Sequence, residues 1–165
     1  MQPNMQKYQL TEEEMNALLE REKHGVISTV GEDGYPYAVP INYVFIDGRI
    51  FFHGRKVGEK VGNLSRDPRC CFTVVTAGGF EYTGELACNT TAIYESVIIR
   101  GKVRKIEDEN EKMSVLRATV DRLTPERKMD VIPPEMVRPT GVFEIVAESK
   151  TGKYHRPMEG HRTVR

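Results

Sequence analysis

Asp47-Gly48 is the dipeptide that most restricts the fold of this chain. Two short apolar runs flank it, Val44-Phe45-Ile46 and Ile50-Phe51-Phe52, and this setting predicts a β-hairpin because a type I′ turn needs positive φ at both central positions. A second turn, at residues 31–34, precedes this hairpin. Connections this short permit only antiparallel pairing, since a parallel crossover needs a dozen or more residues. Residues 26–52 are therefore predicted to form three antiparallel strands.

Pro40 interrupts the middle one of these strands, which is predicted over residues 35–46. A proline has no N–H group to donate to a neighbouring strand. We therefore expect this strand to lie at an edge of the sheet, to carry a bulge, or to open towards a ligand at Pro40.

Two amphipathic helices and three further strands complete the pattern. Thr11-Glu-Glu-Glu14 is a capping box ahead of a helix predicted over residues 12–23. Asp108 can cap a second helix, whose apolar stripe is Met113, Leu116, Val120 and Leu123. The remaining segments are strands at 70–76, 94–106 (with a bulge at Gly101) and 141–150, and a loop at 78–91. The fold class is thus α+β, mainly β: one domain with an antiparallel sheet or barrel and peripheral helices.

Composition narrows the class of function. The 165 residues are 39% hydrophobic and 29% charged, which excludes a wholly disordered chain. The 24 basic and 24 acidic residues cancel, whereas nucleic-acid binders generally carry a basic excess. No stretch supplies the ~20 apolar residues of a membrane span, and residues 1–14 do not resemble a secretory signal. We expect a cytoplasmic protein without a nucleic-acid or membrane partner.

The cysteines, most of the histidines and the C-terminal tail point to no site. Cys70, Cys71 and Cys88 include no Cys-x-x-Cys spacing and are predicted to be reduced packing residues. His24, His155 and His161 lack a paired carboxylate at ligand spacing, so no metal site is predicted. Residues 154–165 are polar and basic, and we expect this tail to be mobile or to lie on a partner chain.

Residues 51–60, Phe-Phe-His-Gly-Arg-Lys-Val-Gly-Glu-Lys, carry the strongest indication of a binding site. A strand runs through Gly54 into a short predicted helix, and the free N–H groups at a helix start bind phosphate readily. Arg55 and Lys56 at that start oppose the helix macrodipole, and Lys60 lies one turn further on. An anion between them and the helix would relieve this repulsion. The alternative is that Arg55 and Lys56 point into solvent.

Gly54, Gly58 and Gly62 recur every four residues, which places them on one helix face at a cost of roughly 1 kcal/mol for each glycine inside the helix. We expect either a strand of the same chain or a ligand to approach that face closely. His53 can contact a phosphate, act as an acid or base near neutral pH, or be structural. The sequence contains no P-loop, dinucleotide-binding fingerprint or nucleophile elbow.

Several segments together match a known pattern. In chain order they are Gly25 to Val44, Ile50 to Gly54, Gly58-Glu-Lys60, Asn63-Leu64, Cys71 to Val75, Tyr94 to Lys102 and Thr151-Gly-Lys153. This succession resembles the FMN-binding split-barrel family related to pyridoxamine 5′-phosphate oxidase, and within it the nitroimidazole-resistance branch. The resemblance covers residues 8–154 and leaves the basic tail, 155–165, outside. The basic pair Arg55-Lys56 departs from the small uncharged segment that the family often has there.

The resemblance implies a six-stranded antiparallel split β-barrel that forms a homodimer, with FMN in clefts between the subunits. It also implies that one strand lies against the flavin ring, that the segment from His53 leads to the ribityl phosphate, and that Lys60 contacts this phosphate. His53 is the catalytic candidate, because a histidine at this position is associated with activity in the nitroimidazole-resistance branch. The implied cofactor-binding residues are Pro40, Ile41, Asn42, Tyr43, His53, Gly54, Arg55, Lys60 and Ser96.

Three functions are compatible with these observations. The first is an FMN-dependent oxidoreductase that uses a reductant such as NAD(P)H and reduces a small electron-poor acceptor, for example a nitroaromatic compound. The second is a binding protein that holds a flavin or haem without turnover, since one fold hosts several functions. The third is a structural dimer that has lost its ligand.

Overall fold

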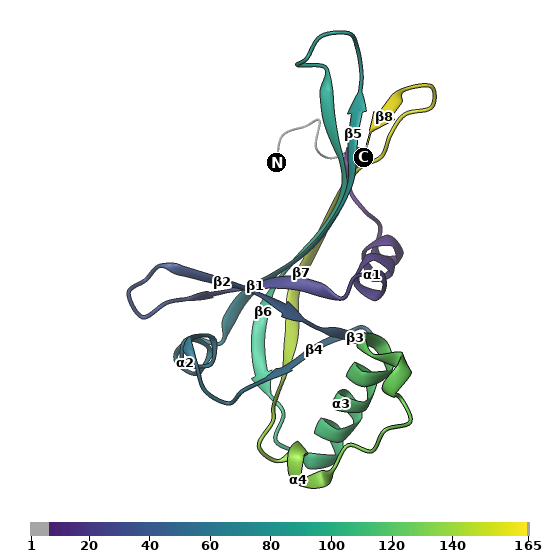
Figure 1. Ribbon diagram of the computed structural model, residues 1–165. Coiled ribbons are helices and arrows are strands. Elements are labelled where there is room, and N and C mark those ends of the chain that lie inside the picture. The colour runs from purple at the N-terminus through teal and green to yellow at the C-terminus, as the bar shows by residue number, and fades with distance from the viewer. Residues whose placement is uncertain (1–6, 165) are drawn as a thin grey trace.

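The computed structural model describes residues 7–164, and Figure 1 shows a sheet of long strands with helices at its sides. The helices are α1 (Glu12–Arg21), α2 (Glu59–Arg66), α3 (Glu109–Leu123), the 3₁₀ turn η2 (Pro125–Arg127) and α4 (Pro134–Val137). The strands are β1 (His24–Val30), β2 (Pro36–Asn42), β3 (Val44–Ile46), β4 (Arg49–Gly54), β5 (Arg69–Tyr82), β6 (Thr90–Lys105), β7 (Gly141–His155) and β8 (Arg162–Val164).

The strand order β2-β1-β5-β6-β7-β4-β3 explains how the sheet closes. Its two end strands, β2 and β3, are consecutive in the chain and are separated by Tyr43 alone. The sheet therefore curls until its two edges are joined through one residue. Every pairing is antiparallel, so the predicted α+β class with an antiparallel barrel is confirmed. Pro40 lies in β2, an edge strand, as its missing N–H requires.

The sheet has eight strands where six were expected. The predicted strand 35–46 is divided at Tyr43, whose N–H donates to the Lys23 carbonyl instead of to a neighbouring strand. The other additional strand, β8, comes from the C-terminal tail. Neither difference alters the fold class.

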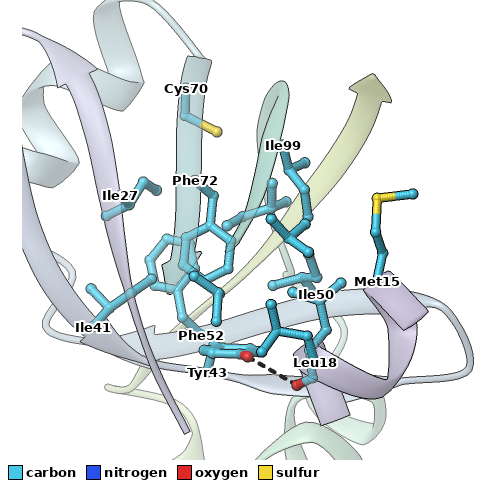
Figure 2. Close-up of a cluster of buried hydrophobic side chains, with 14 of the residues drawn as sticks. Met15, Leu18, Ile27, Ile41, Tyr43, Ile50, Phe52, Cys70, Phe72 and Ile99 are labelled. Atoms are coloured by element: carbon cyan, nitrogen blue, oxygen red, sulfur yellow. Dashed lines mark hydrogen bonds between the residues drawn. The ribbon is translucent and has the colours of Figure 1, made fainter. Parts of the chain in front are cut away.

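Tyr43 also anchors the barrel core, which Figure 2 shows in close-up. Its side chain is 1% exposed, and its ring packs edge-on against Phe72 with the centroids 5.1 Å apart. Its hydroxyl donates to the Leu19 carbonyl at 2.9 Å, the dashed line in Figure 2. Burial raises the pKa of this phenol, so Tyr43 remains a neutral donor.

The local helix signals are confirmed. Thr11 and Glu14 form both hydrogen bonds of the capping box, and the Asp108 side chain accepts from the Glu111 N–H. Helix α1 ends at Arg21, two residues earlier than predicted. In α3 the buried face contains Leu116 together with Lys112, Val115 and Thr119, whereas Met113, Val120 and Leu123 are half-buried. The predicted apolar stripe is therefore only partly right: Leu116 belongs to the buried face of α3, and the other three residues lie at its border.

The predicted loop at 78–91 is wrong over half of its length. Strand β5 continues to Tyr82 and β6 begins at Thr90, so that only residues 83–89 form a loop. The two strands leave the barrel as the long arm visible in Figure 1. The pairing of β5 with β6 shifts by one residue between Ala77 and Gly79, so Gly78 has no partner on β6. The predicted irregularity at Gly101 is present, and a Cβ there would lie 2.1 Å from the Val146 carbonyl oxygen.

The C-terminal tail folds back on its own chain, contrary to the expectation of a mobile or partner-bound segment. Strand β8 pairs with β5, next to Glu81, whose side chain is fully buried. The Glu81 carboxylate accepts hydrogen bonds from His155 Nε2 at 2.5 Å, His161 Nδ1 at 2.7 Å and the Met158 N–H at 2.7 Å. No local sequence pattern indicates this clamp, because Glu81 lies 74 to 80 residues from His155 and His161.

No helix within residues 7–164 is long and apolar enough to cross a membrane. In the same residues, no group of three or more His, Cys, Asp or Glu side chains is arranged to hold a metal ion.

The Glu81 clamp generates a prediction. Glu81→Gln should detach β8, because the amide loses the charge and one of the two acceptors that the three donors share. Limited trypsin digestion at neutral pH should then cut after Arg162 sooner than in the native protein. Glu85→Gln, on the exposed loop at the tip of the arm, is the matched control.

The same clamp should respond to acid. Hydrogen bonds from the Met158 N–H and from His155 lower the pKa of Glu81 from 4.5 to about 2. Because the folded value lies below the ordinary one, the stabilisation is complete above pH ~4.5 and is lost as the pH falls towards 2. Equal cleavage of the native and Glu81→Gln proteins at neutral pH would contradict the role of the clamp.

Candidate functional site

The turn between β4 and α2 forms the candidate site. Strand β4 ends at Gly54, and α2 begins at Glu59 after Gly58, whose φ of 119° lies in a region that favours glycine. Gly58 has no side chain to accept a hydrogen bond from the first turn of α2. The N–H groups of this turn are therefore available to an outside acceptor.

A cavity of about 230 Å³ lies at this turn. Strand β2 forms one wall with Tyr37 and Val39, and the first turn of α2 forms another with Lys60 and Val61. Gly54, Arg55, Val57, Gly58, Glu59 and Phe143 complete the lining. The cavity is thus apolar on the strand side and charged on the helix side.

Lys60 and Arg55 are two cations without a carboxylate partner in the described part of the chain. Lys60 is half-buried, and its Nζ lies 4.8 Å from the centroid of the Phe52 ring. Desolvation lowers the pKa of Lys60, so a bound anion would stabilise its charged form. Both residues lie near a helix start, where cations are unfavourable. The arrangement favours binding of an anion.

Lys56, in contrast, does not join this site. Its Nζ donates to the Arg138 carbonyl at 2.5 Å, at the end of α4. A lysine near the carboxyl end of a helix is favourably placed. Lys56 therefore neither points freely into solvent nor faces the anion site.

The glycine repeat leaves space instead of permitting close packing. A Cβ added at Gly54, Gly58 or Gly62 would meet nothing within 4 Å. The three glycines do not share a helix face, because Gly54 ends β4 and Gly58 is the N-cap residue of α2, so that prediction is wrong. No strand within residues 7–164 packs closely against the Cβ positions of these glycines, and the space beside Gly54 and Gly58 is open.

His53 lies at the edge of this site. Alternate residues of a strand share a face, so His53 shares the face of Phe51, beneath α3, and not that of Phe52 and Gly54. Its side chain is exposed and does not line the 230 Å³ cavity. Partial desolvation, followed by the charge of Lys60, lowers the pKa of His53. Its imidazole is therefore mainly neutral at pH 7.

The segment from Pro40 to Tyr43 presents its backbone more than its side chains. Ile41 and Tyr43 are buried in the core, whereas the side chains of Pro40 and Asn42 are exposed. Because β2 is an edge strand, its outer backbone groups have no ladder partner. A ligand can reach this segment along that edge.

Ser96 lies far from the other candidates within one chain. It is opposite Lys153 on β7, and its hydroxyl donates to the Lys153 carbonyl at 3.5 Å. Gly54 is opposite Gly141 on the same strand, so that about 40 Å of extended strand separates the two positions. The fold brings together Gly54, Arg55 and Lys60, with His53 beside them and Pro40–Tyr43 along the neighbouring edge, but not Ser96.

Sequence reasoning missed the apolar lining of the cavity. Tyr37 and Val39 share a face of β2 with Ile41, and this alternation was a usable signal. Phe143 lies in the cavity wall because β7 pairs with β4 so that Phe143 is opposite Phe52. The two rings stack with their centroids 5.0 Å apart. No local pattern predicts that pairing.

The protein has larger cavities elsewhere, so the candidate site cannot be identified by its volume alone. One of about 430 Å³ lies along β1 and β5 and includes Cys70, Cys71 and Arg100. Another of about 560 Å³ includes Glu32, Asp33 and Glu59. The first adjoins no helix start and the second is mainly acidic, so the charge pattern at Lys60 distinguishes the smaller cavity.

Comparison with known families gives one clear match. The family model described as pyridoxamine 5′-phosphate oxidase matches residues 11–154, which include every element that lines the site. No curated protein matched the chain.

Solved structures share the fold at low sequence identity. A protein from Bacteroides thetaiotaomicron, proposed to confer 5-nitroimidazole antibiotic resistance, has a TM-score of 0.71 at 23% identity over 88% of this chain and 85% of its own. The flavocytochrome Anf3 from Azotobacter vinelandii has a TM-score of 0.82 at 20% identity, over 94% and 72%. An FAD and heme binding protein from Mycobacterium smegmatis has 0.81 at 19%, over 90% and 74%.

The geometry at Lys60 predicts that inorganic phosphate binds this site. At about ten times its Kd, phosphate should raise the Tm of the protein by about 3–6 °C. Lys60→Met should abolish that increase, while Lys128→Met, which removes an exposed lysine in the segment after α3, should retain it. A phosphate effect that survives in Lys60→Met would contradict the assignment of Lys60, and thermal denaturation measures all three proteins.

Proposed function

Because this chain belongs to the pyridoxamine 5′-phosphate oxidase family, we propose that it is a flavoprotein that binds FMN and acts as an FMN-dependent oxidoreductase. The observation that carries the proposal is the cavity at the start of α2, where Arg55 and Lys60 lack carboxylate partners. A ribityl phosphate would supply the anionic partner that Arg55 and Lys60 do not have within residues 7–164.

Different residues of the site fit different parts of this cofactor. Lys60, Arg55 and the N–H groups of the first α2 turn would hold the phosphate, and Gly54 and Gly58 leave room beside it. The free edge of β2 at Pro40–Asn42 would offer backbone groups to the polar edge of the flavin ring. The apolar residues Tyr37, Val39 and Phe143 line the space between them.

One chain does not enclose a whole flavin. The cavity of about 230 Å³ is smaller than the ~300–1,000 Å³ of ordinary ligand pockets, so it accommodates the phosphate end. We infer that a second copy covers the ring, in a homodimer. Four exposed apolar side chains on the outer side of the sheet support this: Val26, Val30, Val75 and Ile98. The residues next to them in each strand point into the core. Ser96 shares that side, opposite Val75, and would reach a flavin of the partner subunit.

Bound FMN would supply the electron transfer, from a reductant such as NAD(P)H to a small electron-poor acceptor such as a nitroaromatic compound. The chain itself would hold the phosphate and limit water on the apolar side of the cavity. His53, neutral at pH 7 and beside Gly54, would donate or accept a proton at an imidazole nitrogen. We assign the protein to the cytoplasm, where thiols stay reduced, since Cys70, Cys71 and Cys88 are all free.

A second candidate function is a carrier of flavin or haem without turnover. Two structures with TM-scores above 0.8 are described as a flavocytochrome and as an FAD and heme binding protein, which favours this alternative. A neutral, exposed histidine such as His53 would also be able to ligate haem iron.

The absorption spectrum of the purified protein tests the proposal. We expect flavin bands and, after denaturation, a released chromophore with the mass of FMN. A haem spectrum would favour the carrier. A colourless protein that also fails to take up added FMN would overturn the flavoprotein assignment.

His53→Ala tests the catalytic role separately. The variant should keep its flavin, because His53 does not line the phosphate cavity, and should lose roughly 100-fold or more of its NAD(P)H-dependent nitroaromatic reduction. Flavin content by absorbance and turnover by NAD(P)H oxidation give the two readings. If the flavin is lost, His53 is a binding residue and the catalytic role falls.

A further inference from the structure

Thr29 lies outside the 230 Å³ cavity and contacts both of the elements that form its walls, β2 and α2. Its side chain lies on β1 and is 3% exposed, although it is polar. The hydroxyl accepts a hydrogen bond from Asn63 Nδ2 of α2 at 3.2 Å and donates to the Tyr37 carbonyl of β2 at 3.4 Å. Tyr37 and the first turn of α2 are the facing walls of the cavity. One buried hydroxyl therefore joins both.

Asn63 is the second member of this link. It is also 3% exposed, and its Oδ1 accepts from the Arg66 guanidinium at 3.1 Å. The same guanidinium donates to the Val30 carbonyl on β1 at 3.0 Å. Helix α2 is thus attached to β1 by a set of hydrogen bonds, with the Thr29–Asn63 contact at its buried centre.

Apolar packing by itself holds α2 weakly. The helix has eight residues, and Leu64 is its single buried apolar side chain, with Val61 half-buried. A helix this short depends on tertiary contacts, and a buried amide without a partner is costly. The polar link to Thr29 therefore determines where α2 lies on the sheet.

The position of Asn63 also determines the position of Lys60, because both residues belong to α2. Lys60, Asn63 and Leu64 are spaced i, i+3 and i+4, so they share one face of α2. A shift of Asn63 would move the Lys60 ammonium and the N–H groups of the first turn together. It would leave the edge of β2 at Pro40–Asn42 in place, because that edge is fixed by its pairing with β1.

We propose that Thr29 and Asn63 are positioning residues for the phosphate end of the flavin. Neither residue lines the cavity at Lys60. The inference rests on the proposed function, and it adds that affinity for the phosphate depends on a buried hydroxyl that does not itself line the cavity.

The test compares Thr29→Val, which keeps the shape but removes the hydroxyl, with Thr29→Ser, which restores it. Affinities for FMN and for riboflavin, which lacks the phosphate, are measured on the full chain by flavin fluorescence. Thr29→Val should weaken FMN binding about tenfold and change riboflavin binding less than about twofold, while Thr29→Ser should behave as the native protein. Hydrogen exchange without ligand should be faster in residues 59–63 of Thr29→Val than of Thr29→Ser.

Two outcomes would overturn the inference. Equal losses of FMN and riboflavin affinity in Thr29→Val would indicate general destabilisation, and unchanged FMN affinity would show that the hydroxyl has no effect on the site. Failure of the proposed function is recognised separately, because the native protein would then bind FMN no more tightly than riboflavin. If Thr29→Val does not fold, Asn63→Leu, which removes the amide and keeps its volume, is compared with the native protein; it should show the same loss of FMN affinity and the same small change for riboflavin.

Discussion

The passage of the chain through Tyr43 is the constraint on which the rest of the structure depends. At this residue the chain leaves one edge of the sheet and begins the other, so a single backbone position joins β2 to β3. Three contacts fix it: the N–H donates to the Lys23 carbonyl, the hydroxyl donates to the Leu19 carbonyl, and the ring packs against Phe72. The Leu19 carbonyl also accepts from the Arg122 guanidinium. The end of α1, whose last carbonyls lack helical partners, is therefore satisfied by the residue that closes the barrel and by α3.

Closure at Tyr43 is what creates the candidate site. It brings the edge strand β2 near β4 and the turn that follows it, so Tyr37 and Val39 face the start of α2 across a small cavity. The cavity is charged on one side because Gly58 leaves the helix start without a side-chain cap and because Arg55 and Lys60 form no ion pair within residues 7–164, although Glu59 also lines the cavity. A curled sheet with a helix at its edge thus places two unpaired cations beside an unpaired strand edge. These are the two features on which the proposed FMN site rests.

The arm is stabilised differently from the barrel. Apolar side chains fill the barrel, whereas the end of the arm depends on a buried carboxylate, Glu81, that accepts three hydrogen bonds from the C-terminal segment. Phe80 and Tyr82 on either side of it remain exposed. With little core to bury, this region obtains its order from polar contacts, which are strong only because water is excluded from them.

The sequence by itself determined the local features: the capping box at Thr11, the N-cap at Asp108, the hairpin at Asp47-Gly48, the edge position of Pro40 as one of three alternatives, and the strand-to-helix turn at residues 54–60. Each depends on residues within a few positions of one another, so turn chemistry, proline geometry and helix capping suffice to predict it. The tertiary structure decided the extension of β5 and β6 into the arm, the docking of the tail on Glu81, and the lining of the cavity by Tyr37 and Phe143. It also separated Ser96 from Lys60 within one chain. The physical reason is that strand register and buried polar contacts join residues tens of positions apart, and their energy exists only after the chain has brought the partners together and excluded water.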